Sequence, residues 1–371
     1  MARDDGGTAL VDPVYVPLLP MRRAAWQAYE RLDARLRGRV APLWSVVPRT
    51  GPERVRGDRP AADPDEDPAA LAPWFIGRVD AFLEASSGAT GWVDTAHVER
   101  LVDASAIGLW HLATRSRLRL VTGPERDHNL QRYAADLSFL TGRGLGIRIL
   151  LDEPPEEPRS AELLDLVDRV CLPPSQLDLL LDLGPVADTA DASKTALAAV
   201  DLLGGLLPWR TVVLAAGAFP RAVEHRESPL PLVVPRHDWH MHRLVRASRP
   251  GFPRPLLYGD YSAEHALRAN IPSIQRPGPP WALMRYSAPD AFLVAPAPTR
   301  GAHRADRVRA TARKITEAEA FRPGASQGER WLVDCATGDG SAGTGNAETW
   351  IRVGHIQHMS FVIEQLTSAK G

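Results

Sequence analysis

The chain has 371 residues, of which 44% are hydrophobic and 24% are charged, with a formal net charge of -1 at pH 7. This composition is typical of a globular protein, and the length allows one large α/β domain or two average ones. A net charge near zero argues against a dedicated nucleic-acid or membrane-surface protein, because binding to phosphates needs a concentrated positive field. Arginine carries most of the positive charge, since lysine occurs only at positions 194, 314 and 370.

The cysteines and the N-terminal sequence bear on the cellular compartment. Cys171 and Cys335 are far apart in the sequence, which excludes a disulfide framework and gives no zinc spacing. We expect two free, buried thiols in a reducing cytoplasm. The opening Met-Ala-Arg-Asp-Asp-Gly-Gly has no apolar segment typical of a signal peptide, and no run approaches the roughly 18 apolar residues of a membrane span. The sequence therefore predicts a cytoplasmic protein without a membrane partner.

Short apolar segments alternate with helical patterns along residues 13–264, as in parallel β-α units. Eight strands with intervening helices over about 250 residues predict an α/β fold, a (β/α)8 TIM-barrel-like single domain. An open doubly wound sheet is the competing fold, but no predicted strand is followed by a Gly-x-Gly-x-x-Gly phosphate fingerprint. The predicted strands are residues 14–19, 42–47, 91–94, 118–122, 147–151, 177–183, 211–215 and 255–261.

The two ends of the chain depart from this alternation. We expect residues 1–12 to form a flexible arm and residues 265–371 to form a C-terminal cap packed on the barrel. The cap has the pattern of a β-hairpin followed by helices. Its predicted elements are strands at 281–286, 291–295 and 329–334 and helices at 304–319 and 349–366, and a Pro-rich exposed loop is predicted at 49–70.

Acidic residues follow several predicted strands, and three of them are candidate catalytic groups. Asp94, Asp152 and Asp260 would lie on the face formed by the C-terminal ends of the strands, where side chains from different strands converge. Paired carboxylates can divide general acid and base roles or hold a hard cation. The alternative is that each acid caps a helix or pairs with an arginine. The sequence names no cofactor, and no metal site is predicted.

A second group of residues is expected to bind a ligand. A glycine in Tyr258-Gly259-Asp260-Tyr261 lets the backbone turn, so that an acid and a phenol can face the barrel mouth. Arginine suits bidentate contacts with phosphate or carboxylate, and histidine and arginine three residues apart on a helix can face the same anion. For each residue the alternative is an ordinary turn, cap or packing role. The predicted ligand-binding residues are Arg236, Tyr258, Gly259, Tyr261, Arg285, Asn346, Trp350 and His355.

Four sequence blocks, in this order and spacing, resemble those of a known family. The blocks are Tyr-Val-Pro-Leu-Leu at 15–19, Pro-Arg-His-Asp-Trp at 235–239, Leu-Leu-Tyr-Gly-Asp-Tyr at 256–261 and Gly-Asn-Ala-Glu-Thr-Trp-Ile-Arg-Val-Gly-His-Ile-Gln-His at 345–358. Together they resemble the phage T4-type beta protein family. After the first strand, Met21-Arg22-Arg23 stands where the family often has a lysine. The resemblance implies a phage or phage-conflict setting and leaves the activity open.

Two functions follow from these patterns. The first is a barrel protein that binds an anionic, phosphate- or nucleotide-like ligand or a protein partner at the C-terminal face of the strands. The second is a hydrolytic enzyme that acts on a phosphate-bearing small molecule through the strand-end carboxylates. Convergence of these acids in one pocket would favour the enzyme.

Overall fold

The fold is given by a computed structural model, which describes residues 15–48, 68–86, 88–221, 223, 230–266, 279–339, 341 and 343–368. The predicted arm at 1–12 and most of the predicted loop at 49–70 lie outside the described residues. Within the described part, none of the helices combines the length and apolar character needed to cross a bilayer.

Eight parallel strands close into a barrel, which confirms the predicted (β/α)8 fold. Closure occurs where β9 pairs with both β7 and β1, with Tyr258 opposite Tyr15 in the second of these pairs. A doubly wound sheet would have left these edges unpaired, so the closed order excludes it. The barrel strands are β1 (Tyr15–Pro20), β2 (Leu43–Ser45), β3 (Trp92–Asp94), β4 (Arg119–Thr122), β5 (Leu145–Leu150), β6 (Leu177–Pro185), β7 (Thr211–Gly217) and β9 (Leu256–Asp260).

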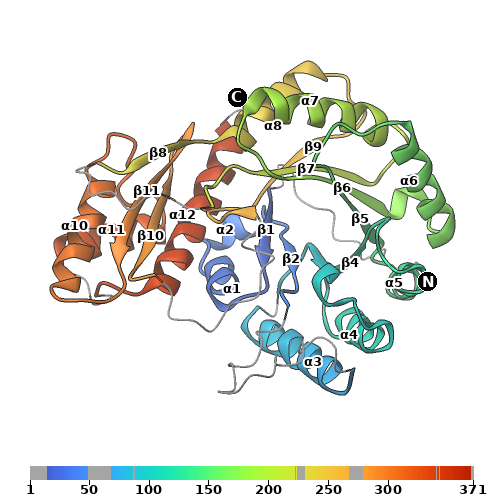
Figure 1. Cartoon of the computed structure of the whole chain (residues 1–371), viewed down its shortest axis with the longest axis horizontal. Coiled ribbons are helices and arrows are strands. Elements are labelled where there is room, and N and C mark those ends of the chain that lie inside the picture. Colours follow the sequence, from blue (N-terminus) through green and yellow to red (C-terminus); the bar gives the residue numbers. More distant parts are fainter. Residues whose placement is uncertain are drawn as a thin grey trace, which may run out of the picture.

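Helices between the strands cover the outside of the barrel (Figure 1). N-capping residues define where several of these helices begin. Asp127 accepts hydrogen bonds from the first amides of α5, and Asp188 does the same for α7. The helices are α1 (Arg23–Glu30), α2 (Ala34–Arg37), α3 (Pro68–Ala85), α4 (Val102–Arg115), α5 (His128–Thr141), α6 (Glu157–Val170), α7 (Thr189–Ala199) and α8 (His237–Ser248).

Alternate residues of each strand point inward or outward, so each strand contributes to two cores. The outward residues pack with the helices in the largest apolar cluster. The inward residues fill the barrel, and the Trp92 indole donates a 2.8 Å hydrogen bond to Asp178 among them. The barrel interior is therefore a packed core, as is usual for this fold.

The C-terminal part of the chain builds a small sheet beside the barrel (Figure 1). Strands β10 (Trp281–Ser287) and β11 (Ala291–Pro298) form the predicted hairpin, and β8 (Leu232–Pro235) joins it as a third antiparallel strand. Helices α10 (Arg304–Thr316) and α11 (Gln327–Thr337) pack against this sheet and one another. Helix α12 (Ala347–Ser368) lies between the sheet and the barrel, in contact with α1, β1 and β10.

Two expectations from the sequence were wrong. The predicted strand at 329–334 is part of α11, because Ser326 accepts a hydrogen bond from the Gly328 amide and Leu332 and Cys335 recur at helical spacing toward the core. Cys335 is buried as expected, but Cys171 is exposed, at the C-terminal end of α6. Strand β8 was not predicted, since only its pairing with β11 defines it.

Candidate functional site

Four polar side chains from different strands converge inside the barrel near the C-terminal ends of β3, β5 and β6. Arg148 of β5 donates to Asp94 of β3 (Nη1–Oδ2 2.5 Å) and to Asp182 of β6 (Nε–Oδ2 2.9 Å). It also donates to the hydroxyl of Tyr261 (3.0 Å), which itself donates to Asp182 (2.7 Å). All four side chains are buried. We call these four residues the ion cluster.

The polar groups of the ion cluster find their hydrogen-bond partners within the protein. Arg126 donates to the other oxygen of Asp94 at 2.7 Å. Burial alone would raise the pKa of Asp94, but Arg126 and Arg148 outweigh it and hold that pKa well below its usual range. Burial and the charge of Asp182 raise the pKa of Tyr261. The carboxylates of Asp94 and Asp182 are therefore paired with arginines inside the barrel.

Asp260 faces the opposite side of the barrel wall, because it alternates with the inward Tyr261. Its carboxylate accepts hydrogen bonds from the Tyr15 hydroxyl, from the Tyr258 hydroxyl (2.8 Å) and from the backbone amide of Ser262 (2.7 Å). His358 of α12 brings Nε2 to 2.8 Å from the same carboxylate. Asp260 therefore joins β1, β9 and α12, and it shares no recorded contact with Asp94 among the described residues.

The hydrogen bonds of His358 link this network to the small sheet. Because Asp260 can only accept when ionised, Nε2 of His358 donates to it, and Nδ1 lies 2.7 Å from the Ser287 hydroxyl at the end of β10. Burial would raise the pKa of Asp260, but His358 and then Arg236 lower it below its usual range. Burial raises the pKa of the adjacent Asp238, whose Oδ1 has no hydrogen-bond partner in the described structure.

A third chain of contacts lies at the rim of the mouth, just after β9. The Ser262 hydroxyl is 2.9 Å from Nδ1 of His355, and Nε2 of His355 is 3.3 Å from Oε2 of Glu264. Burial would raise the pKa of Glu264, but His355, Arg285 and Arg22 outweigh it and bring that pKa to about 2. Glu264 is therefore an ionised carboxylate at neutral pH, held in place by α12.

Glu264 forms one wall of a pocket of about 360 Å³ at the ends of β9, β1 and β2. Arg22 and Arg23 follow β1, and Arg78 reaches the pocket from α3. Arg23 pairs with Glu348 of α12 at 3.1 Å. Arg78 is half-buried near the Trp74 ring, and within the described chain no carboxylate pairs with it. We call this the mouth pocket, because it is lined by residues just after β1, β2 and β9, together with residues of α1, α3 and α12.

The residues predicted as catalytic are placed in three separate environments. Asp94 belongs to the ion cluster, Asp260 lies outside the barrel wall, and Asp152 is exposed on a bend after β5. No hydrogen bond or ion pair joins Asp152 to either of the others in the described structure. The three acids do not share one pocket.

The predicted ligand-binding residues are also dispersed, and most have packing roles. Arg236 is buried among the rings of Trp239, Phe292 and Phe361, with its guanidinium carbon 5.4 to 5.8 Å from their centroids. The Tyr258 hydroxyl lies 2.7 Å from Asp238 and 2.8 Å from Asp260, and its single proton is shared between the two carboxylates.

The other predicted ligand-binding residues are held by backbone contacts or close packing. Gly259 lies in the barrel wall, where a Cβ would come within 3.0 Å of Ala215. Arg285 donates to the Ala263 carbonyl at 2.8 Å. At the start of α12, Asn346 accepts from the Thr349 amide and Trp350 donates to the Thr344 carbonyl. His355 contacts Glu264, a residue that lines the mouth pocket.

Sequence reasoning missed Arg148 and the mouth-pocket residues Arg78 and Glu264. A single charged residue within the apolar segment Leu-Gly-Ile-Arg-Ile-Leu was a usable signal for Arg148. Arg78 and Glu264 carried none, because one lies in a helix and the other follows β9 by several residues. Among the described residues, no group of three or more His, Cys, Asp or Glu is placed to hold a metal ion.

We expect Arg148→Met to destabilise the protein by about 3–5 kcal/mol, because it leaves Asp94 and Asp182 buried without their shared cation. Urea unfolding at pH 7 measures the loss. Arg132→Met on α5 is the matched control, since Arg132 is exposed, and should change stability by less than about 0.5 kcal/mol. Equal stability of the two variants would contradict a stabilising ion cluster.

Glu264→Gln tests the charge at the rim. A carboxyl whose folded pKa of about 2 lies below its ordinary 4.5 adds stability above pH 4.5, and loses it as the pH falls toward 2. The variant should therefore be less stable than the wild type at pH 7 by on the order of 2–3 kcal/mol, and the difference should shrink between pH 4.5 and 2. Urea midpoints across this range check it, with exposed Glu319→Gln as control. A difference independent of pH would refute the assignment.

Similarity to known proteins lies at the level of a family. No curated protein shows significant similarity to the chain. A solved glucosidase from Croceicoccus marinus is similar at 14% identity and a TM-score of 0.31, covering 55% of this chain and 48% of that chain. The chain thus spans about half the length of that glucosidase. The model of the family described as Beta protein matches residues 15–364, and the chain belongs to this family.

Proposed function

We propose that this protein binds a small anionic molecule in the mouth pocket. The ligand carries one phosphate or carboxylate and also hydroxyl groups. The observation that carries this proposal is the pairing of unlike groups in one pocket: a half-buried Arg78 without a carboxylate partner in the described chain, and an ionised Glu264. An arginine offers a forked donor to an anion, and a carboxylate accepts from a hydroxyl.

The size and charge of the mouth pocket support a small ligand. A volume of about 360 Å³ lies at the lower end of the range for small-molecule sites. Among the described residues, three arginines and two glutamates line it, which is an excess of one positive charge in this part of the lining. Its position at the C-terminal ends of the strands is also where sites of this fold usually lie.

The surroundings of Glu264 support a preorganised site. His355 holds the carboxylate from α12, and the Ser262 hydroxyl holds the other nitrogen of the ring. Ser262, two residues beyond the end of β9, adopts a positive φ of 53°, a conformation that is costly for a residue with a side chain. Such strain is retained where the surrounding contacts impose it, and here they fix the direction of Glu264.

A hydrolytic role is the second candidate, favoured by the order Ser262–His355–Glu264, in which a base lies between a hydroxyl and an acid. Two facts weigh toward binding instead. Ser262 is 2% exposed and His355 is fully buried, so a substrate would not reach the hydroxyl. The acids Asp94, Asp152 and Asp260 do not share a contact. The family adds the proposal of a phage-conflict setting, in which a protein partner at this face is the other possible occupant.

We expect Arg78→Gln to weaken binding of ribose 5-phosphate by about tenfold or more, because a charged hydrogen bond contributes roughly 1.5–3 kcal/mol. Isothermal titration at pH 7 measures it, and phosphate release is followed in parallel. Exposed Arg132→Gln, which removes the same charge elsewhere, should bind like the wild type.

Three results would count against the account in different ways. Equal affinity of Arg78→Gln and the wild type would refute the arginine contact. Failure of the wild type to bind phosphosugars or inorganic phosphate would refute the proposed ligand class. Release of phosphate that depends on Glu264 would move the assignment to the hydrolytic candidate.

A further inference from the structure

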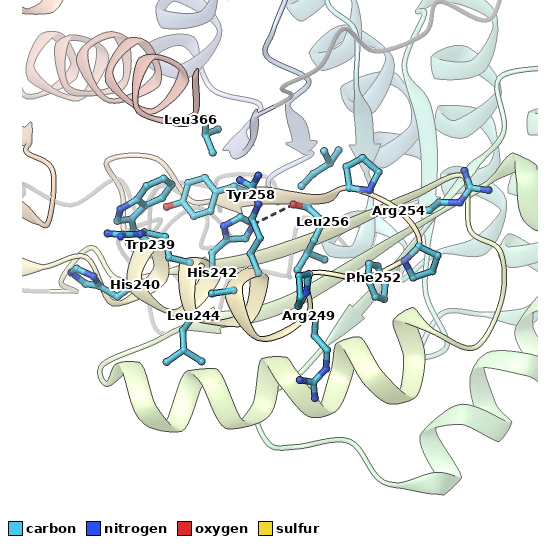
Figure 2. Close-up of a pocket in the computed structure, with 17 residues that line it drawn as sticks. Trp239, His240, His242, Leu244, Arg249, Phe252, Arg254, Leu256, Tyr258 and Leu366 are labelled. Atoms are coloured by element: carbon cyan, nitrogen blue, oxygen red, sulfur yellow. Dashed lines mark hydrogen bonds between the residues drawn. The ribbon is translucent and has the colours of Figure 1, made fainter. Parts of the chain in front are cut away.

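A second, larger concavity lies at the other end of β9, away from the mouth. Its volume is about 1180 Å³, more than three times that of the mouth pocket. It is bounded by α8, by the segment 249–255 and by the first residues of β9, with Leu366 of α12 above it (Figure 2). We call it the arginine groove.

The rim of the arginine groove is strongly basic. Arg243, Arg246, Arg249 and Arg254 line it, and no Asp or Glu is among the described residues that do so. Arg249 is held by Asp201 outside the groove. Arg243, Arg246 and Arg254 are exposed, and none of them forms an ion pair within the described part of the chain. This local excess contrasts with the net charge of -1 for the whole chain.

The three unpaired arginines of the described groove come from two segments of its wall. Arg243 and Arg246 are three residues apart on α8, so they project from one face about 4.5 Å apart along the helix axis. Arg254 comes from the segment just before β9, and lies with Phe252 at the far end of the groove from Trp239 (Figure 2). A ligand with several anionic groups in a row can therefore meet more than one guanidinium at once.

The floor of the groove is apolar. Phe252, Leu256 and Leu257 are half-buried, and prolines flank them. His242 below the floor has its Nε2 3.3 Å from the Leu256 carbonyl, and burial lowers its pKa to about 4, so it is uncharged at neutral pH. The floor offers apolar contact, and the positive charge of the groove belongs to its arginine rim.

We propose that the arginine groove binds an organic polyphosphate, a molecule in which a run of phosphates is joined to a flat apolar ring. Guanidinium groups bind phosphate oxygens through paired hydrogen bonds, and the half-buried floor accepts the ring. This site is distinct from the mouth pocket and does not depend on the function proposed for it. Nucleoside triphosphates and inorganic polyphosphate share the phosphate run, and the ring distinguishes them.

Titration of the full chain with ATP and with inorganic tripolyphosphate, both in EDTA, tests the proposal. The wild type should bind ATP more tightly than tripolyphosphate. The triple variant Arg243→Gln/Arg246→Gln/Arg254→Gln should lose at least about a hundredfold in ATP affinity, because two or more charged hydrogen bonds disappear. Since all three side chains are exposed, its thermal midpoint should stay near that of the wild type.

Two control variants test whether a loss of ATP affinity is specific to the arginine groove. The triple variant Arg115→Gln/Arg117→Gln/Arg132→Gln removes three exposed arginines elsewhere, and should bind ATP within about twofold of the wild type because net charge acts only weakly at a distance in salt. Arg78→Gln should also bind ATP normally.

The proposal is overturned if the groove variant binds ATP like the wild type, or if both triple variants lose affinity equally. Loss of ATP binding in Arg78→Gln would place the nucleotide in the mouth pocket instead. Equal affinity for ATP and tripolyphosphate would refute the contribution of the apolar floor.

Discussion

The carboxylate of Asp260 joins the parts of this protein that sequence alone leaves separate. It lies at the end of the strand that closes the barrel, and it accepts hydrogen bonds from Tyr15 on β1 and from Tyr258 on its own strand. His358 of α12 donates a hydrogen bond to the same carboxylate. Its other ring nitrogen contacts Ser287 of the small sheet. Removing a partner from a buried carboxylate is destabilising, so barrel closure and docking of α12 stabilise one another through Asp260.

The polar contacts near the C-terminal ends of the barrel strands form two separate groups. One turn along α12 from His358, His355 is positioned over the segment after β9 and fixes Glu264. In the second group, Arg148 draws Asp94 and Asp182 together and fills the space between their strands. The strand-end acids Asp94 and Asp182 are thus paired with Arg148 inside the barrel, whereas the ionised Glu264 lies beside arginines in the mouth pocket. That asymmetry favours ligand binding over a reaction that needs several converging acids.

Much of the fold could be predicted because its signals are local. Each barrel strand is a short apolar run that ends at a polar residue or turn, and the helices between them show their own periodicity. The strand predicted at 329–334 was wrong because the apolar run around Leu332 is equally compatible with a helix, and a cap at Ser326 decides it. The candidate site was less predictable, since Arg78 and Glu264 are nearly two hundred residues apart and only barrel closure brings them to one pocket. The position of Asp260 at a strand end predicts a catalytic carboxylate, but its outward direction depends on a register that the sequence does not reveal.

The most direct test of the central claim is a crystal structure of the full chain grown with ribose 5-phosphate. The account predicts the phosphate within hydrogen-bonding distance of Arg78 and a sugar hydroxyl on Glu264, with the contacts of Asp260 unchanged. A saturated crystal whose ligand lies elsewhere, or in which the Arg148 cluster has opened to receive it, would contradict the account.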